Sequence, residues 1–270
     1  MKKSNLVSVL IVSYNAERYI EKTLRSCLNQ TYSSLEILVL DNASDDKTVE
    51  IIKSLNDPRI TLFEGKKNVG PYAGLNFLLD RAGGEYVAIQ DHDDIWLPEK
   101  IAKQIDFLQN NDDSIACGTS TFYYFESKEV LILNKKSPYP NFVDHTSLVF
   151  RNKGFRYDIN HTLADELFEK KTLLKEGKIY CLQEPLTVHR IKKGGGNLSS
   201  SRFTFSFKSV TDFFSVNAIS ARNFLYLVDL LFGKLISEDV VWFVRRKITL
   251  RSAEWISLDQ FQKHFPAVVL

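Results

Sequence analysis

Short runs of β-branched residues alternate with helical periodicity over the first 125 residues, and no other feature constrains the fold as strongly. This alternation is typical of parallel strands covered by helices. We expect strands at residues 7–13, 36–41, 60–64, 86–91 and 115–123. Helices are expected between them, beginning near Glu17, Ser44, Pro71 and Pro98, with Ser44 as the N-cap of the second. The chain is therefore predicted to be an α/β protein with a mostly parallel central sheet flanked by helices.

Regular patterning weakens after residue 125. Pro138, Pro140 and Gly154 interrupt the next thirty or so residues, up to about Asp158, where we expect irregular connections and a mixed edge of the sheet. A helix is predicted over 163–176, ended by Gly177, and two short strands follow at 179–182 and 186–190. The remaining segments are a basic glycine-rich loop at 192–197, an aromatic stretch at 203–214 and a helix at 216–232.

The composition excludes several classes of protein. Lys and Arg total 35 against 33 Asp and Glu, so a net charge of +2 gives no field that favours nucleic acid as a partner. Cys27, Cys117 and Cys181 form no pair motif, which fits reduced thiols in the cytoplasm. Ser8 breaks the first apolar run, and no stretch reaches the roughly 18 apolar residues of a membrane span.

Three carboxylates follow the strand predicted at 86–91. Asp91, Asp93 and Asp94 lie very close together in the chain, and like charges at such spacing raise one another's pKa. A hard divalent cation resolves this repulsion, because Mg²⁺ or Mn²⁺ binds through one or two carboxylates and takes further ligands from substrate phosphates. The pattern therefore favours a diphosphate-bearing substrate. The alternative is a solvated acidic turn that caps the helix at Pro98.

Two other predicted strands also end in polar residues. Ser13, Tyr14 and Asn15 follow the first strand, and Asp41 closes the second. Ligands of open parallel sheets bind outside the carboxyl ends of the strands, so these residues and the acidic cluster should meet at one crevice. Tyr14 is suited to stack on a base, and Asp41 to accept the imide N–H of that base. Each is also compatible with an ordinary strand-to-helix turn.

Four ordered motifs carry a resemblance to a known family. They are VLIVSYNAERYI at 9–20, LDNASDDKT at 40–48, NVGPYAGLN at 68–76 and DHDDIWLPEK at 91–100. With ADE at 164–166 and EPLTVHR at 184–190, they resemble family 2 inverting glycosyltransferases of GT-A fold, of the type that builds bacterial surface polysaccharides. The resemblance covers roughly residues 5–200. It implies a GT-A catalytic domain over 1–200 and leaves 201–270 as a helical C-terminal extension.

The resemblance also implies roles for particular residues. Asp91 and Asp93 would form the metal and diphosphate motif, with Asp93 as the direct ligand of Mn²⁺ or Mg²⁺. Asp165 matches the catalytic base, which deprotonates the acceptor hydroxyl as it attacks the anomeric carbon from the face opposite the departing diphosphate, so that the configuration inverts. The residues implied in substrate binding are Ser13, Tyr14, Asn15, Asp41, Asn68, Asp91, His189 and Arg190.

The substrates follow from the resemblance only as classes. The implied donor is a nucleotide-diphosphate sugar, either a UDP or a dTDP sugar, and the implied acceptor is a saccharide or a lipid-linked glycan. The sugar and the linkage depend on the shape of the pocket, for which the sequence contains no motif.

Three positions depart from the family pattern. Asn42 stands where Asp is commoner, Ala164 replaces the usual Glu before the base, and Lys171 replaces an Arg whose bidentate contact a lysine cannot reproduce. Structural alternatives also stay open: Asp165 as a helix cap, His189 as a core histidine, and residues 190–197 as a solvated linker instead of a loop closing over phosphates.

Two other enzyme classes are disfavoured. A sugar nucleotidyltransferase would need a glycine-rich, arginine-bearing loop after the first strand, and a dinucleotide dehydrogenase would need GxGxxG there, but residues 13–17 offer neither. A non-catalytic nucleotide-sugar-binding domain stays open, although Asp91, Asp93 and Asp165 are all present.

The C-terminal third mixes aromatic and basic residues. Residues 240–248, VVWFVRRKI, suit a helix lying on an anionic membrane surface, where a lipid-linked acceptor would be presented. The alternative is a helical pair packed on the catalytic sheet, with Arg245, Arg246 and Lys247 in solvent. We expect a cytoplasmic protein that, under the first alternative, makes peripheral contact with the inner face of the membrane.

Overall fold

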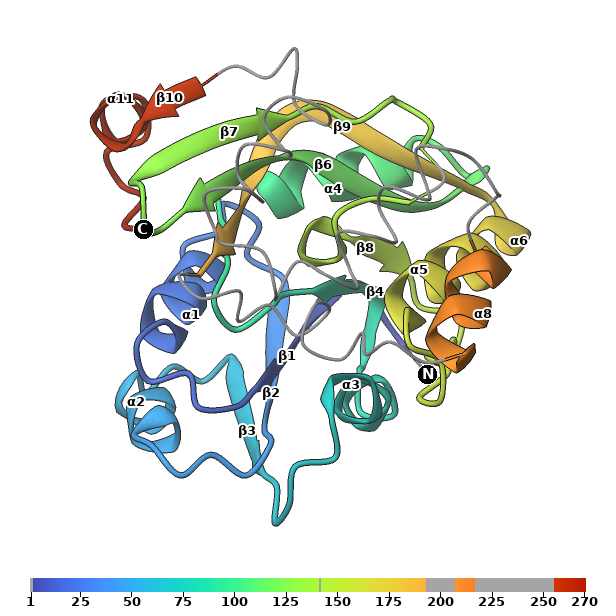
Figure 1. Ribbon diagram of the computed structural model, residues 1–270, viewed down its shortest axis with the longest axis horizontal. Coiled ribbons are helices and arrows are strands. Elements are labelled where there is room, and N and C mark those ends of the chain that lie inside the picture. Colours follow the sequence, from blue (N-terminus) through green and yellow to red (C-terminus); the bar gives the residue numbers. More distant parts are fainter. Residues whose placement is uncertain (1, 141, 193–206, 217–254) are drawn as a thin grey trace.

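The computed structural model describes residues 2–140, 142–192, 207–216 and 255–270 (Figure 1). These residues form a mixed sheet flanked by helices, which confirms the predicted α/β class. The strands are β1 Lys3–Ser13, β2 Leu35–Asp41, β3 Ile60–Glu64, β4 Gly84–Ile89, β5 Ile95–Trp96, β6 Ser114–Phe125, β7 Val130–Asn134, β8 Val149–Arg151, β9 Lys178–Ile191 and β10 Trp255–Ser257. The helices are α1 Ile20–Leu28, α2 Thr48–Ser54, α3 Pro71–Leu79, α4 Lys100–Gln109, the 3₁₀ turn η1 His145–Ser147, α5 Ala164–Leu167, the π-helical η2 Phe168–Leu173, α6 Leu174–Glu176, α8 Phe207–Val216 and α11 Leu258–His264.

The parallel half of the sheet holds most of the core. β1 lies between β2 and β4 and runs parallel to both, and β3 extends this half beyond β2. Val7, Val9 and Ile11 of β1 pack with α1, α2 and α4, whereas Leu10 packs with α3 on the other face. Burial on both faces explains why the strand reads as an almost continuous apolar run. The carboxyl ends of these strands therefore lie at one edge of the sheet.

The strands and helices predicted in this half are confirmed, but one expected cap is wrong. Ser44 does not cap α2, which begins at Thr48 after Lys47. The Ser44 hydroxyl donates instead to Asp41 at 2.5 Å, and Asp46 accepts the Thr48 amide at 2.9 Å. The Ser44 side chain therefore bonds to Asp41 and not to the first turn of α2.

The second half of the sheet is mixed, as the sequence predicts for the region after residue 125. β6 pairs antiparallel with β7 and β8, and β8 joins it to β4. The two short strands predicted at 179–182 and 186–190 are in fact one strand, β9, which runs parallel to β6 and shifts register around Pro185. Proline has no N–H to give to the ladder, so the strand passes it through an irregularity instead of ending there.

The helix predicted over 163–176 contains an irregularity that the sequence does not reveal. It comprises α5, the π-helical η2 and α6, and it ends at Gly177 as predicted. Such π-helical turns occur frequently at functional sites. α8 lies beside this segment in Figure 1, and Asp212 of α8 accepts hydrogen bonds from the Thr162 amide and hydroxyl at 3.0 and 2.8 Å.

The C-terminal residues return to the sheet. β10 pairs antiparallel with β7, and Phe261 of α11 packs edge-on against Phe122 with ring centroids 5.4 Å apart. The helix predicted at 216–232 beyond its first residue, the basic segment at 240–248 and the loop beyond Lys192 lie outside the described residues. The domain division and the membrane contact therefore stay predictions. Among the residues described, no helix has the length and apolar character needed to cross a membrane.

We predict that Gly118→Ala destabilises the protein. Gly118 lies in β6 beneath the segment that leads to η1, and a Cβ there would lie 2.5 Å from Cγ1 of Val143. Relieving that overlap requires Val143 to move, at a cost of about 1–3 kcal/mol in the free energy of unfolding. Urea denaturation measures the loss. The control is Gly83→Ala, whose Cβ would meet only the Glu36 carboxylate at 3.4 Å. Equal stability of the two variants would contradict the close packing of Val143.

Candidate functional site

The ends of β1 and β2 form the first part of the site. Ser13 and Asp41 are both buried there, and Asp41 accepts the Ser44 amide at 3.0 Å through Oδ2. Asn15 has a left-handed φ of 46°, and its amide donates to the Ser44 hydroxyl at 3.0 Å. Tyr14 is 42% exposed. Ser44 thus links the two strand ends, and the Tyr14 side chain stays open to solvent beside them.

Asn42 has a structural reason to differ from the commoner Asp. Its Nδ2 donates to Asn68 Oδ1 at 3.0 Å, and its Oδ1 accepts the Val69 amide at 2.9 Å. Asn68 Oδ1 also accepts the Gly70 amide, at the start of α3, at 2.9 Å. An ionised carboxylate at position 42 cannot donate, so the amide is what ties β2 to the predicted substrate residue Asn68.

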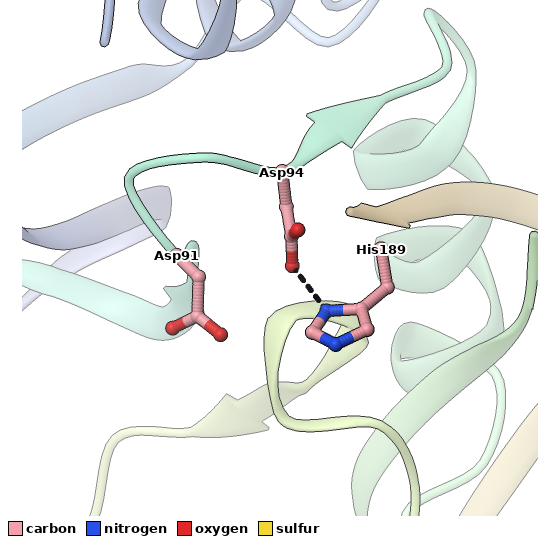
Figure 2. A group of neighbouring side chains, drawn as sticks. All are labelled: Asp91, Asp94 and His189. Carbon is pink, nitrogen blue, oxygen red and sulfur yellow. Dashed lines mark hydrogen bonds and ion pairs between the residues drawn. The ribbon is translucent and has the colours of Figure 1, made fainter. Parts of the chain in front are cut away.

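The acidic cluster after β4 meets the end of β9. Figure 2 shows Asp91, Asp94 and His189 facing a common space, and their ligand atoms all lie within 4.8 Å of one another. Asp94 is fully buried. Its Oδ2 lies 2.8 Å from His189 Nδ1, and its Oδ1 accepts the Arg190 amide at 2.8 Å. The acidic turn is therefore bonded to a strand far away in sequence and is not merely a solvated helix cap.

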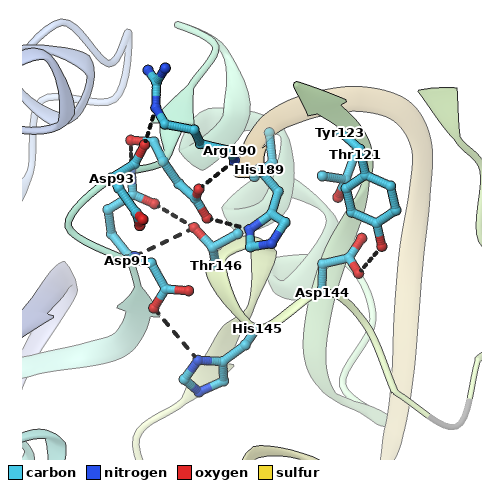
Figure 3. Close-up of polar contacts among 12 residues, drawn as sticks. Asp91, Asp93, Thr121, Tyr123, Asp144, His145, Thr146, His189 and Arg190 are labelled. Atoms are coloured by element: carbon cyan, nitrogen blue, oxygen red, sulfur yellow. Dashed lines mark hydrogen bonds and ion pairs between the residues drawn. The ribbon is translucent and has the colours of Figure 1, made fainter. Parts of the chain in front are cut away.

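Asp93 points to a different partner. Its carboxylate forms an ion pair with Lys192 at 2.6 Å, and its carbonyl accepts Nε of Arg190 at 3.0 Å (Figure 3). Burial opposes ionisation of Asp93, but His92 and Lys192 outweigh it and lower the pKa of this carboxyl. The predicted ligand Asp93 thus lies beside the cluster, while Asp94, which had no assigned role in the sequence analysis, is part of it.

The charges of the cluster suit a cation. Removal from water and the nearby carboxylates of Asp94 and Asp93 raise the pKa of Asp91 above its usual range. Burial lowers the pKa of the His189 imidazole, but the ion pair with Asp94 outweighs burial and raises that pKa to about 10. A bound cation would relieve the repulsion between the carboxylates. Two carboxylates and an imidazole form a donor set that suits Mn²⁺ better than Mg²⁺, because Mg²⁺ prefers oxygen ligands alone.

Arg190 is held by aromatic rings as well as by the acidic turn. Its side chain is buried, with the guanidinium carbon 5.0 Å from the centroid of the Tyr19 ring and 5.2 Å from that of Tyr124. Nη1 lies 3.5 Å from Oε1 of Glu126. These contacts fix the end of β9, so that His189 is presented to Asp94 in one orientation.

Asp165 lies at the second residue of α5, near the same space. α5 leads into η2, whose Phe168 stacks on Tyr157, and the Tyr157 hydroxyl contacts His145 beside Asp91. The charge of Asp165 also contributes to the raised pKa of Asp91. Its Oδ1 accepts the amide of Glu166 at 3.0 Å, whereas the N-cap position belongs to Leu163. Asp165 is thus not the N-cap residue, but its carboxylate does accept an amide of the first helical turn, so the structural alternative stays open.

Sequence reasoning missed three residues beside Asp91. His145 Nδ1 lies 4.0 Å from Asp91 Oδ1, and its Nε2 lies 2.9 Å from the Tyr157 hydroxyl. Next to it, partly buried Asp144 accepts the hydroxyl of Tyr123, from β6, at 2.8 Å (Figure 3). Asp144, His145 and Tyr157 belong to the irregular region 125–158, where no motif or periodicity indicates a site.

Comparison with known proteins identifies the family. The model of "Glycosyl transferase family 2" matches residues 8–170. An uncharacterised glycosyltransferase of Haemophilus influenzae is 35% identical over 138 residues, which are 50% of this chain and 55% of the relative. The Escherichia coli protein WfaP, described as a UDP-Glc:α-D-GlcNAc-diphosphoundecaprenol β-1,3-glucosyltransferase, is 38% identical over 104 residues, 38% of this chain and 41% of that protein. The matches thus span about half or less of these relatives.

Solved structures share the fold at low sequence identity. Staphylococcus aureus TarS, residues 1–349 in complex with UDP-GlcNAc, gives a TM-score of 0.61 at 18% identity over 91% of this chain and 77% of that one. The mannosyltransferase PcManGT of Pyrobaculum calidifontis, in complex with GDP-Man and Mn²⁺, gives 0.60 at 19% identity over 83% and 68%. Both support the GT-A architecture predicted from the motifs. Because the family model matches more than half of the chain, the chain belongs to glycosyltransferase family 2.

Proposed function

We propose that this chain transfers a sugar from a nucleotide-diphosphate donor to a saccharide or lipid-linked acceptor in the synthesis of surface polysaccharide, with inversion at the anomeric carbon. The observation that carries the proposal is the cluster of Asp91, Asp94 and His189, formed at a turn whose His92 contacts the Val12 carbonyl near the end of β1 at 3.3 Å. A cation there and the separate carboxylate of Asp165 are two groups that can assist such a displacement.

The strand ends would bind the nucleotide. The Asp41 carboxylate, which also accepts from Ser44, would accept a base N–H, and exposed Tyr14 offers a ring on which a base can stack. TarS and PcManGT were solved with UDP-GlcNAc and GDP-Man, and WfaP is named for UDP-Glc, so nucleotide sugars are the donor class among similar proteins. We favour a UDP or dTDP sugar. The name of WfaP likewise supports a lipid-linked acceptor.

Asp91, Asp94 and His189 would hold the divalent cation. When bound there, a cation such as Mn²⁺ stabilises the charge that develops on the leaving diphosphate. Around it, Arg190 fixes the end of β9, and Lys192 pairs with Asp93. Asp93 keeps the metal role that the family resemblance implies only if this pair opens.

Asp165 would act on the acceptor. As a carboxylate near Asp91 it is placed to remove the proton from the acceptor hydroxyl while that oxygen attacks the anomeric carbon. A single displacement from the face opposite the diphosphate inverts the configuration. General-base catalysis of this kind contributes typically about 10²–10⁴-fold to the rate.

The metal assignment predicts different effects for two neighbouring aspartates. Asp94→Asn should weaken Mn²⁺ binding by about 10-fold or more, because it removes a ligand charge and the partner of His189. Asp93→Asn, the matched control one residue away, should leave Mn²⁺ affinity within a few-fold. Electron paramagnetic resonance of free Mn²⁺ measures both. If Asp93→Asn weakens Mn²⁺ binding more than Asp94→Asn does, Asp93 and not Asp94 is the ligand.

The base assignment predicts a loss of turnover without loss of donor binding. Asp165→Asn should lower kcat by about 100-fold or more, while the Kd for the nucleotide-sugar donor stays nearly constant, because the carboxylate acts on the acceptor. Glu166→Gln provides the control, since Glu166 pairs with Lys170 at 2.8 Å outside the cluster. Collapse of donor binding with turnover preserved would make Asp165 structural.

Mn²⁺ affinity should depend on pH with a definite sign. In the metal-free protein His189 carries a proton below its raised pKa of about 10, and a ligand nitrogen must lose that proton. Affinity should therefore rise between pH 6.5 and 9, by up to about tenfold per unit for each proton released. The slope should be smaller in His189→Gln. An identical slope in both proteins would exclude His189 as a ligand.

A further inference from the structure

His145 lies beside the proposed cation site, and its contact Tyr157 stacks on Phe168 in the segment that follows Asp165. It begins η1, and its side chain is 14% exposed. Its Nδ1 faces Oδ1 of Asp91 at 4.0 Å (Figure 3). Neither the motifs nor the proposed reaction gives this histidine a role.

The backbone that carries His145 is fixed to the acidic strand end. The hydroxyl of Thr146 donates to Gln90 Oε1 at 2.7 Å and accepts the Asp91 amide at 3.5 Å. The Thr146 carbonyl accepts Nε1 of Trp96 at 2.8 Å. His145 therefore moves with Asp91 as one unit, and this kind of support is what a precisely placed binding group requires.

The ring of His145 is fixed by Tyr157. The Tyr157 side chain is buried and stacks on Phe168 of η2, with centroids 4.1 Å apart and planes 22° apart. Its backbone is held by Asn76 of α3, which donates to the Tyr157 carbonyl and accepts its amide, both at 2.9 Å. The hydroxyl that contacts His145 thus has a fixed position between two helical segments.

We assign the hydrogen of the His145 ring to Nδ1. The Tyr157 hydroxyl lies 2.9 Å from Nε2, and with this hydroxyl as the donor Nε2 is the acceptor. At 4.0 Å from Asp91, Nδ1 is too far to bond the carboxylate directly. A hydroxyl placed between them can accept from Nδ1 and donate to Asp91.

We propose that His145 binds a hydroxyl of the transferred sugar and, with Asp91, selects the donor sugar. The assignment rests on the proposed function. In the proposed reaction the anomeric carbon is joined to the diphosphate at the cation and is attacked from the side of Asp165. A group that lies beside Asp91 and packs through Tyr157 on the segment after Asp165 would face the sugar ring. The contact is with the donor sugar, because the turn that carries His145 is bonded to the strand end of Asp91, on the leaving-group side.

The experiment compares binding of UDP-glucose and of UDP in the presence of Mn²⁺. dTDP-glucose and dTDP replace them if they bind more tightly, since the sugar is the same. His145→Phe should lower affinity for the nucleotide sugar by about 3- to 10-fold, the value of one hydrogen bond, and leave affinity for the nucleotide unchanged within twofold. Tyr157→Phe, which keeps the stacked ring but loses the hydroxyl, should give a smaller loss of the same kind.

A series of 2-, 3-, 4- and 6-deoxy derivatives of the same nucleotide glucose identifies the hydroxyl. The wild type should bind one deoxy derivative several-fold more weakly than the parent nucleotide glucose. His145→Phe should bind that derivative and the parent with equal affinity. His145→Gln, whose amide can donate, should restore part of the discrimination. His264→Phe, an exposed position on α11, should behave as the wild type.

Three outcomes would overturn the assignment. Undiminished discrimination by His145→Phe against every deoxy derivative would show that His145 does not contact the sugar. An equal loss of affinity for nucleotide and nucleotide sugar would make its role structural. If the wild type binds neither the nucleotide nor the nucleotide sugar, the proposed function itself is wrong. This result is distinct from the first two because the wild type alone gives it.

Discussion

The buried carboxylate of Asp94 is the contact on which the candidate site depends. It accepts the Arg190 amide through one oxygen and pairs with His189 through the other. In this way the turn after β4, in the parallel half of the sheet, is joined to β9 in the mixed half. Truncating one partner of a buried charge pair typically costs about 3–5 kcal/mol, because the other charge is left uncompensated. The site and the sheet are thus stabilised by the same pair.

A second set of contacts joins the turn of His145 to the helical segment of Asp165. Stacking of Tyr157 on Phe168 links the His145 turn to the π-helical segment that follows Asp165. Glu169 of that segment accepts the Val143 amide at 2.7 Å, and burial raises its pKa well above the usual range. The groups proposed to handle donor and acceptor therefore pack against one another. A substitution on either side should shift the side chains on the other.

Much of this arrangement could be predicted from sequence, and the exceptions have physical reasons. The strands of the parallel half follow from apolar runs, and their polar ends indicate one crevice. The sequence could not decide which carboxylate of the acidic turn faces inward, because the partner of Asp94 is 95 residues away in the chain. His145 and Tyr157 lie in a region without periodicity, and only folding brings them beside Asp91. The two strands predicted at 179–182 and 186–190 are continuous because β6 stays paired with β9 across the irregularity at Pro185.

Pulsed electron paramagnetic resonance of bound Mn²⁺ would show whether the Asp91, Asp94 and His189 cluster holds a divalent cation. With UDP present, the wild type should give electron spin-echo modulation from a coordinated imidazole nitrogen, shifted by ¹⁵N-histidine labelling and absent in His189→Gln. Mn²⁺ bound tightly together with UDP but without nitrogen modulation would contradict this assignment.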